Sequence, residues 1–248
     1  MPVTNLSMSL FVLLVTLDWF SPNLLVSGTF TQATIATSST TTKPCNLPVK
    51  RNCLCLFDMD RTLTGKQGEV GSKCPQNALQ YGVTDTAYGG GTLTLSEFGL
   101  NINKSECAAC YLGTISAGDA GGPNSEERRV LHSHLAVNFG MLPSVQWSDP
   151  HPVTSPLVVS CPDRTKQTAI PGVLAWYKER GIVVNNEHVH FFDDRGDNVE
   201  AFRGTPYNAR QISCGSRDMG GVIGFCGAAL AEVVLSKGVS KCDVSLAV

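Results

Sequence analysis

The chain is poor in charge and lacks the features of several protein classes. Charged residues make up only 16% of its 248 residues, and the formal net charge is -2. It contains no long run of Lys or Arg, so the sequence predicts no nucleic-acid partner. It also contains no internal repeat, and no apolar run approaches the about 20 residues of a membrane-spanning helix.

The N-terminal residues are unlike the rest of the chain, because residues 1–42 include neither Lys nor Arg. Residues 8–17 form an apolar stretch of the length found in secretory signals. We therefore expect residues 1–28 to be a signal peptide, or an uncleaved signal anchor because the basic start of a signal is missing. Residues 29–44 are rich in Ser and Thr and are expected to be a linker. Membrane contact is expected only if the leader stays uncleaved.

The remaining residues, 45–248, have the size of one domain and hold every cysteine of the chain. An even number of cysteines after an export leader predicts up to five disulfides and a secreted or secretory-lumen location. The pairing stays open, and the spacing of Cys107 and Cys110 also fits a zinc or redox pair. No second Cys/His pair with zinc spacing accompanies them, which favours disulfides. Asn103-Lys104-Ser105 is a glycosylation sequon, typical of a secreted glycoprotein.

Short apolar runs alternate with helical patterns along this domain. Strands are predicted at residues 53–57, 111–116, 157–159 and 189–192. Helices are predicted after Asn124 or Ser125, over residues 168–180, and over residues 221–236, with a turn or hairpin at residues 89–91. This alternation predicts an α/β fold, a Rossmann-like doubly wound parallel sheet covered on both faces.

Polar side chains follow the predicted strands at the points where the strands end. They are Asp58 and Asp60 after the first strand, Ser116 after the second, Lys166 after the third, and Asp193 with Asp194 after the fourth. In open parallel sheets, ligands bind beyond these carboxyl ends. Two buried carboxylate pairs repel each other unless a cation or proton lies between them, which favours a metal or catalytic site.

The run Asp58-Met59-Asp60-Arg61-Thr62-Leu63-Thr64, followed by a hydroxyl, a lysine and a second Asp-Asp pair in this order, resembles the motifs of the haloacid dehalogenase-like phosphohydrolases. The resemblance spans roughly residues 53–198. It implies that Asp58 is a nucleophile that forms an aspartyl-phosphate and that Asp60 is the general acid and base. It also implies a Mg²⁺ ion held by Asp58, Asp193 and Asp194 and by the backbone carbonyl of Asp60.

The same resemblance implies that Ser116, Thr62 and Lys166 serve the substrate phosphate. Ser116 would bind a phosphate oxygen, with Thr114 as a rival; Lys166 would pair with the nucleophile and the phosphate; and Thr62 would order the loop. Asn198, with Asp197 beside it, stands where many family members have an acid. The residue that supports the metal there is therefore left open.

The gaps between the motifs leave room for little or no cap domain, so the expected site is open to a phosphorylated and bulky substrate. The resulting hypothesis is a Mg²⁺-dependent phosphatase acting on a phosphate monoester. Two alternatives stay open: a secreted binding or effector protein that kept the fold without turnover, and a phosphotransferase. The Arg-containing segment 203–218 could also bind substrate, or be a surface loop.

Overall fold

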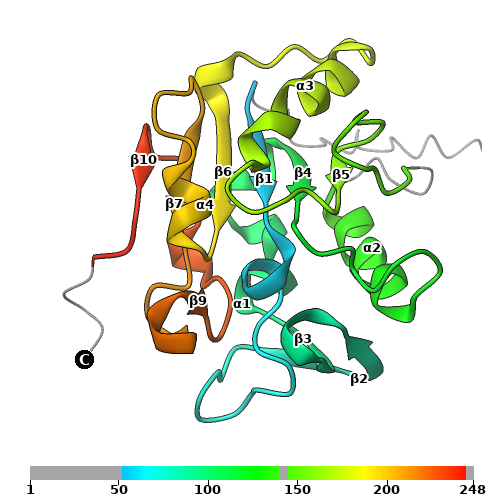
Figure 1. Cartoon of the computed structure of the whole chain (residues 1–248), viewed down its shortest axis with the longest axis vertical. Coiled ribbons are helices and arrows are strands. Elements are labelled where there is room, and N and C mark those ends of the chain that lie inside the picture. The colour runs from blue at the N-terminus through cyan, green and yellow to red at the C-terminus, as the bar shows by residue number, and fades with distance from the viewer. Residues whose placement is uncertain (1–51, 140–144, 244–248) are drawn as a thin grey trace, which may run out of the picture. The chain divides into compact units, whose positions relative to one another are not determined.

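Six short strands form a parallel sheet at the centre of the computed structural model (Figure 1). The structure describes residues 52–139 and 145–243, which belong to one compact unit, Asn46–Val248. The expected leader, residues 1–28, and the expected linker, residues 29–44, lie outside the described residues. The strands are β1 (Leu54–Phe57), β4 (Tyr111–Ile115), β5 (Leu157–Val158), β6 (Val189–Asp193), β7 (Asn208–Gln211) and β10 (Val239–Ser240), in the spatial order β10-β7-β6-β1-β4-β5.

The two central strands, β1 and β6, are buried along their whole length. Their continuous apolar runs are typical of parallel strands with both faces covered. The ring of Phe57 stacks on that of Phe192 and contacts that of Phe98, which joins the end of the sheet to the layer below it. The prediction of an α/β fold with a parallel sheet flanked by helices is therefore confirmed, and the arrangement is compatible with a Rossmann-like fold.

Four α-helices lie beside the sheet (Figure 1). They are α1 (Glu97–Leu100), α2 (Glu126–Phe139), α3 (Ile170–Lys178) and α4 (Gly196–Glu200). The hydroxyl of Ser125 caps α2 by accepting a hydrogen bond of 3.0 Å from the backbone N–H of Arg128. Pro171 lies in the first turn of α3, and Gly181 follows that helix with a φ of +77°. Proline is favoured at the start of a helix and glycine just after its end, so both residues lie where the sequence predicted them.

An antiparallel hairpin is inserted between β1 and β4. Its strands are β2 (Ala78–Asp85) and β3 (Gly91–Leu95), and Asp85 pairs with Gly91 at the turn. The turn that the sequence predicts at residues 89–91 is confirmed, because Gly89 and Gly90 both adopt positive φ angles.

The prediction of a last helix over residues 221–236 is wrong. Within this segment, β9 (Ile223–Gly224) pairs with the preceding β8 (Arg217–Asp218) in a two-stranded ribbon, and a short single turn follows at Leu230–Glu232. The backbone of Gly227 is left-handed, and a Cβ there would collide with the carbonyl of Thr64. The segment therefore packs as irregular chain against the loop after β1. Its glycines allow the two backbones to lie close together, and they also disfavour a helix.

Four disulfides join residues far apart in the sequence. They are Cys53–Cys110, Cys55–Cys107, Cys74–Cys226 and Cys214–Cys242. The alternative of a zinc or redox pair at Cys107 and Cys110 is wrong. Cys107 forms a disulfide with Cys55 in β1, and Cys110 forms one with Cys53, the residue before β1. Cys161 is free and buried, and Cys45 lies outside the described residues. Disulfides in this number are typical of an extracellular or secretory-pathway environment. In the part of the chain that the structure describes, no helix is long and apolar enough to cross a bilayer.

Candidate active site

The carboxyl ends of β1 and β6 meet at the point where the chain order of the sheet reverses. From β1, the next sheet strands are β4 and then β5 on one side, whereas β6, β7 and β10 lie on the other. Phe57 pairs with Phe192 in register, and the N–H of Asp58 donates to the carbonyl of Phe192 at 2.9 Å. This register brings Asp58 beside Asp193. Such a switch point is where ligands bind in open α/β sheets.

Lys166 joins the two carboxylates across this edge. Its Nζ lies 2.7 Å from Asp58 Oδ1 and 2.7 Å from Asp193 Oδ2. The lysine side chain is only 1% exposed, so both bonds are charge-assisted and shielded from water. Lys166 begins the helical turn that leads into α3, so a residue far from β1 in sequence reaches the end of that strand.

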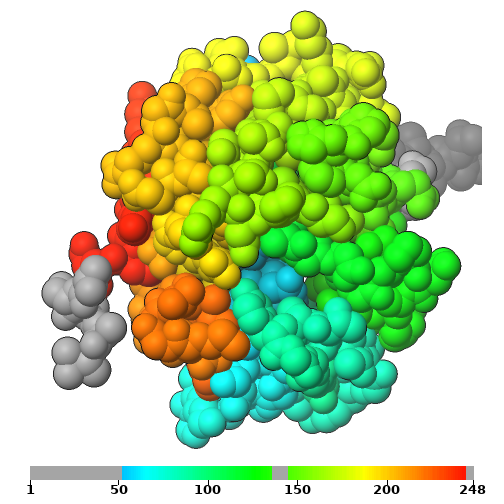
Figure 2. Space-filling view, viewed as in Figure 1, coloured from blue at the N-terminus to red at the C-terminus, as the bar shows by residue number. Residues whose placement is uncertain are grey.

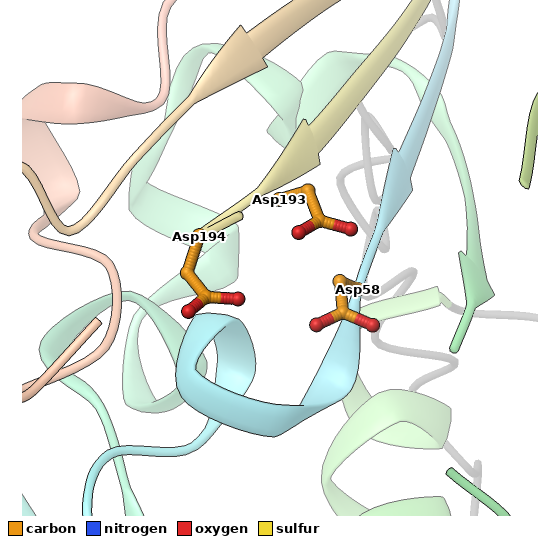
Figure 3. Close-up of side chains that lie close together, drawn as sticks. All are labelled: Asp58, Asp193 and Asp194. Carbon is orange, nitrogen blue, oxygen red and sulfur yellow. The ribbon is translucent and has the colours of Figure 1, made fainter. Parts of the chain in front are cut away.

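Asp194 faces the same point from the far side, as Figure 3 shows for the three aspartates. Its Oδ2 accepts a hydrogen bond of 2.5 Å from the N–H of Gly224, and its own N–H donates to Thr62 Oγ1 at 3.1 Å. Its Oδ1 is buried and has no hydrogen-bond partner among the described residues. The loop after β6 is thus held by the loop of Thr62 and by the loop of Gly224, while Oδ1 of Asp194 is left without a partner among the described residues.

The residues present fit a hard divalent cation. One oxygen each from Asp58, Asp193 and Asp194 lies within 4.8 Å of the other two, and all three residues are buried. The unpaired Oδ1 of Asp194 is a polar atom that burial would penalise without a ligand. Carboxylate oxygens are the ligands that Mg²⁺ prefers in proteins.

The electrostatics of the cluster reflect its burial. Burial, opposed by Lys166 and assisted by Asp193, raises the pKa of Asp58 to about 7. Burial and the charge of Asp193 likewise raise the pKa of Asp194. Burial alone lowers the pKa of Lys166, but its ion pairs with Asp193 and Asp58 raise it overall. The lysine therefore stays charged, and it does not neutralise all three carboxylates.

Asp60 lies in a single wide turn, Met59–Leu63, that follows β1 and in which Asp60 and Arg61 have non-helical backbone angles. The N–H of Thr64 closes this turn on the carbonyl of Met59 at 3.0 Å, and Arg61 adopts a φ of +66° inside it. The turn brings the side chain of Asp60 close to Gly118. A Cβ at Gly118 would lie 2.6 Å from Asp60 Oδ2 and 3.8 Å from Ser116 Oγ. Asp60 and Ser116 thus approach the same glycine.

The hydroxyls at the end of β4 are both buried. Ser116 and Thr114 each have a side-chain oxygen with no hydrogen-bond partner in the described chain. Ser116 follows the last residue of the strand and lies near Asp60, whereas Thr114 lies within the strand, paired with Leu157. The geometry therefore gives Ser116 the better access to a ligand at the sheet edge.

Asn198 occupies the position left open by the sequence, and it supports Asp193. Its Nδ2 donates to Asp193 Oδ2 at 3.0 Å and to Asp163 Oδ1 at 2.9 Å, and the residue is fully buried. Asp197 instead pairs with Arg195 and Arg164 on the outer side. Asn198, and not Asp197, thus belongs to the candidate site.

Arg217 lies in the segment 203–218 that the sequence offered as substrate-binding or surface loop, whereas Tyr88 was not singled out. Nη1 of Arg217 donates to the carbonyl of Asp194 at 2.9 Å, so Arg217 braces the loop after β6 by bonding its backbone. Tyr88, at the hairpin tip, is 40% exposed. Burial, followed by the charges of Asp194, Asp58 and Asp60, raises the pKa of its phenol, and the guanidinium carbon of Arg61 lies 5.0 Å from the centre of its ring.

The chain has no significant match among protein-family models, curated proteins or solved structures. The function must therefore be argued from the site itself.

Proposed function

We propose that the chain is a Mg²⁺-dependent phosphatase of the haloacid dehalogenase-like type, acting on a phosphate monoester with Asp58 as the nucleophile. The observation that carries the proposal is the pair of 2.7 Å bonds from Lys166 to Asp58 and Asp193, with the unpaired Oδ1 of Asp194 opposite. A nucleophilic carboxylate, a fixed cation and metal-type ligands at one strand end are what phosphoryl transfer requires.

In the first step, a carboxylate oxygen of Asp58 attacks phosphorus, and the bond from phosphorus to the ester oxygen breaks. The leaving oxygen takes a proton from Asp60. Burial and the repulsion of Asp58, Asp85 and Glu127 raise the pKa of Asp60, which favours the protonated acid that this step needs. Lys166 offsets the charge of the nucleophile and of the phosphoryl oxygens, and the Ser116 hydroxyl is free to donate to one of them.

In the second step, Asp60 takes a proton from water, whose oxygen attacks the phosphorus of the aspartyl-phosphate and releases Asp58 and inorganic phosphate. A Mg²⁺ held by Asp58, Asp193 and Asp194 would supply the charge neutralisation that brings two anions together. Asn198 and Arg195 keep Asp193 oriented by hydrogen bonds to its two oxygens. Gly224 and Thr62 do the same for Asp194.

The small β2–β3 hairpin is the only insertion between β1 and β4 in the described chain that approaches the site, which supports an enzyme without a full cap domain. In Figure 2 the segment after β1 (blue) is visible at the base of a hollow beside the hairpin (teal). This hollow supports access by a bulky phosphorylated substrate.

The test is hydrolysis of an aryl phosphate by the disulfide-bonded protein with Mg²⁺ and with EDTA. We expect turnover that requires Mg²⁺ and is lost in Asp58→Asn, whereas Asp149→Asn, which removes an exposed carboxylate, retains it. Full activity in Asp58→Asn, or in EDTA, would contradict the proposal. Transfer of phosphate to an added alcohol in preference to water would replace it with a phosphotransferase.

A further inference from the structure

A second group of carboxylates lies beside the candidate active site and comes from three separate parts of the chain. Asp60 lies in the turn after β1, Asp85 ends β2, and Glu127 lies in the first turn of α2. One oxygen from each lies within 4.8 Å of the others. We propose that Asp60, Asp85 and Glu127 form a second site for a hard divalent cation of the calcium class.

The structure holds these carboxylates in place while leaving oxygens free. The N–H of Ala87 donates to Asp85 Oδ1 at 2.8 Å. The N–H and hydroxyl of Thr86 both donate to Glu127 Oε2, at 2.9 and 3.1 Å. Each of these bonds uses one oxygen of its carboxylate. Adjacent residues of the hairpin therefore orient two of the three acids before any ligand arrives.

Asp85 supplies an independent sign of a ligand. Its Oδ2 has no hydrogen-bond partner among the described residues, although the side chain is only 1% exposed. A buried carboxylate oxygen without a partner costs free energy on the order of 1–3 kcal/mol or more, and a cation removes this cost. A proton on Asp60, whose pKa is raised by burial and by its acidic neighbours, is the alternative to a cation, and the titration below distinguishes the two.

The cluster also lacks an ion pair. None of the salt bridges among residues 52–139 and 145–243 includes Asp60, Asp85 or Glu127, and Lys166 and Arg61 act on them only from a distance. The neutral side chain of Gln67 interacts with the Asp85 carboxyl but supplies no positive charge. Arg61 is occupied by Asp218, Gln67 and the carbonyl of Gly224. Three carboxylates with so little compensation are the arrangement that calcium sites stabilise.

Calcium suits this geometry better than magnesium does. Ca²⁺ accepts irregular sets of oxygen ligands at about 2.3–2.6 Å, whereas Mg²⁺ demands a near-ideal octahedron at about 2.0–2.1 Å. A cation here would tie the hairpin to the turn after β1 and to α2. The second site would therefore fix the hairpin that carries Tyr88. A cation bound to the Asp60 carboxylate would also keep this residue from donating a proton, so an occupied second site would oppose the general-acid role proposed for Asp60.

Calorimetric titration of the full disulfide-bonded chain with Ca²⁺ tests the proposal. We expect the wild type to bind two equivalents, one for each acidic group, and Asp85→Asn and Asp193→Asn to bind one each. Asp149→Asn, the exposed control, should bind as the wild type does. Hydrogen exchange of residues 78–95 should slow on adding Ca²⁺ to the wild type and to Asp193→Asn, but not to Asp85→Asn.

The outcomes separate this proposal from the proposed function. Wild-type stoichiometry in Asp85→Asn, or a single wild-type site that only Asp193→Asn removes, overturns the second site and leaves the first. A single site that only Asp85→Asn removes supports the second site, and the first, which is proposed for Mg²⁺, is then tested by titration with Mg²⁺. Circular dichroism checks that each variant folds, and Glu127→Gln replaces Asp85→Asn if that variant does not. Loss of one equivalent in Glu127→Gln supports the second site, and retention of both overturns it.

Discussion

Replacing Lys166 by Met should destabilise the metal-free protein strongly. The substitution keeps much of the side-chain volume but removes the positive charge between Asp58 and Asp193, where the lysine is 1% exposed and makes two bonds of 2.7 Å. Breaking a buried pair by removing one partner costs about 3–5 kcal/mol, because the remaining charges stay buried without compensation. We therefore expect the free energy of unfolding in EDTA to fall by about that amount.

Urea unfolding under non-reducing conditions measures this loss. Lys178→Met is the matched control, because Lys178 is exposed at the end of α3 and should change stability by less than about 0.5 kcal/mol. Mg²⁺ should recover part of the loss in Lys166→Met, since a cation bound by the aspartates replaces some of the missing charge. If the unfolding midpoints of Lys166→Met and Lys178→Met coincide in EDTA, the bridging role of Lys166 is wrong.

Three further predictions concern the same cluster. Burial raises the pKa of Asp58 from its ordinary value of 3.8 to about 7 in the folded protein, so between these pH values the metal-free native state binds more protons than the unfolded state. The metal-free protein should therefore lose stability as pH rises from 4 to 7, by at most about 4 kcal/mol from this group, and urea midpoints with Mg²⁺ should depend less on pH. In EDTA, Asp193→Asn should destabilise the protein by at least about 1 kcal/mol more than Asp194→Asn does, because Asp193 pairs with the buried ammonium of Lys166 whereas Asp194 has an unpaired oxygen. Equal urea midpoints for the two variants would contradict this difference. Replacing Cys74 and Cys226 by Ser should lower the free energy of unfolding by about 2–5 kcal/mol. It should also weaken Mg²⁺ binding in calorimetry, because this disulfide anchors the loop whose Gly224 N–H donates to Asp194. Unchanged affinity for Mg²⁺ would show that the loop is fixed without the disulfide.

The central strands and the acids at their ends could be predicted from the sequence because both have local signals. β1 and β6 are continuous apolar runs that end in Asp58 and in Asp193-Asp194, and a parallel sheet brings such ends together. Lys166 could be placed after the third predicted strand from the pattern, but its pairing with Asp58 was implied only by the resemblance. Its bonds to two strands depend on where the turn before α3 packs.

The partners that come from the hairpin and from the C-terminal part had no such signal. Asp85 and Glu127 are single acids in unremarkable contexts, and only the folded hairpin brings them to Asp60. Gly224 acts through its backbone N–H, which no residue pattern reports. The strands β7 and β10 were missed because β7 carries polar residues and β10 is only Val239–Ser240. The helix expected over residues 221–236 failed because close packing of glycines outweighed its apolar spacing.

Fluorine NMR of the protein with beryllium fluoride and Mg²⁺ tests the central claim most directly, because it needs no knowledge of the substrate. Beryllium fluoride binds a nucleophilic carboxylate in place of a phosphoryl group. We predict bound fluoride signals that require Mg²⁺, persist in Asp149→Asn and disappear in Asp58→Asn. A folded wild-type protein that binds Mg²⁺ but gives no such signals, or signals unchanged in Asp58→Asn, would contradict the assignment of Asp58 as the nucleophile.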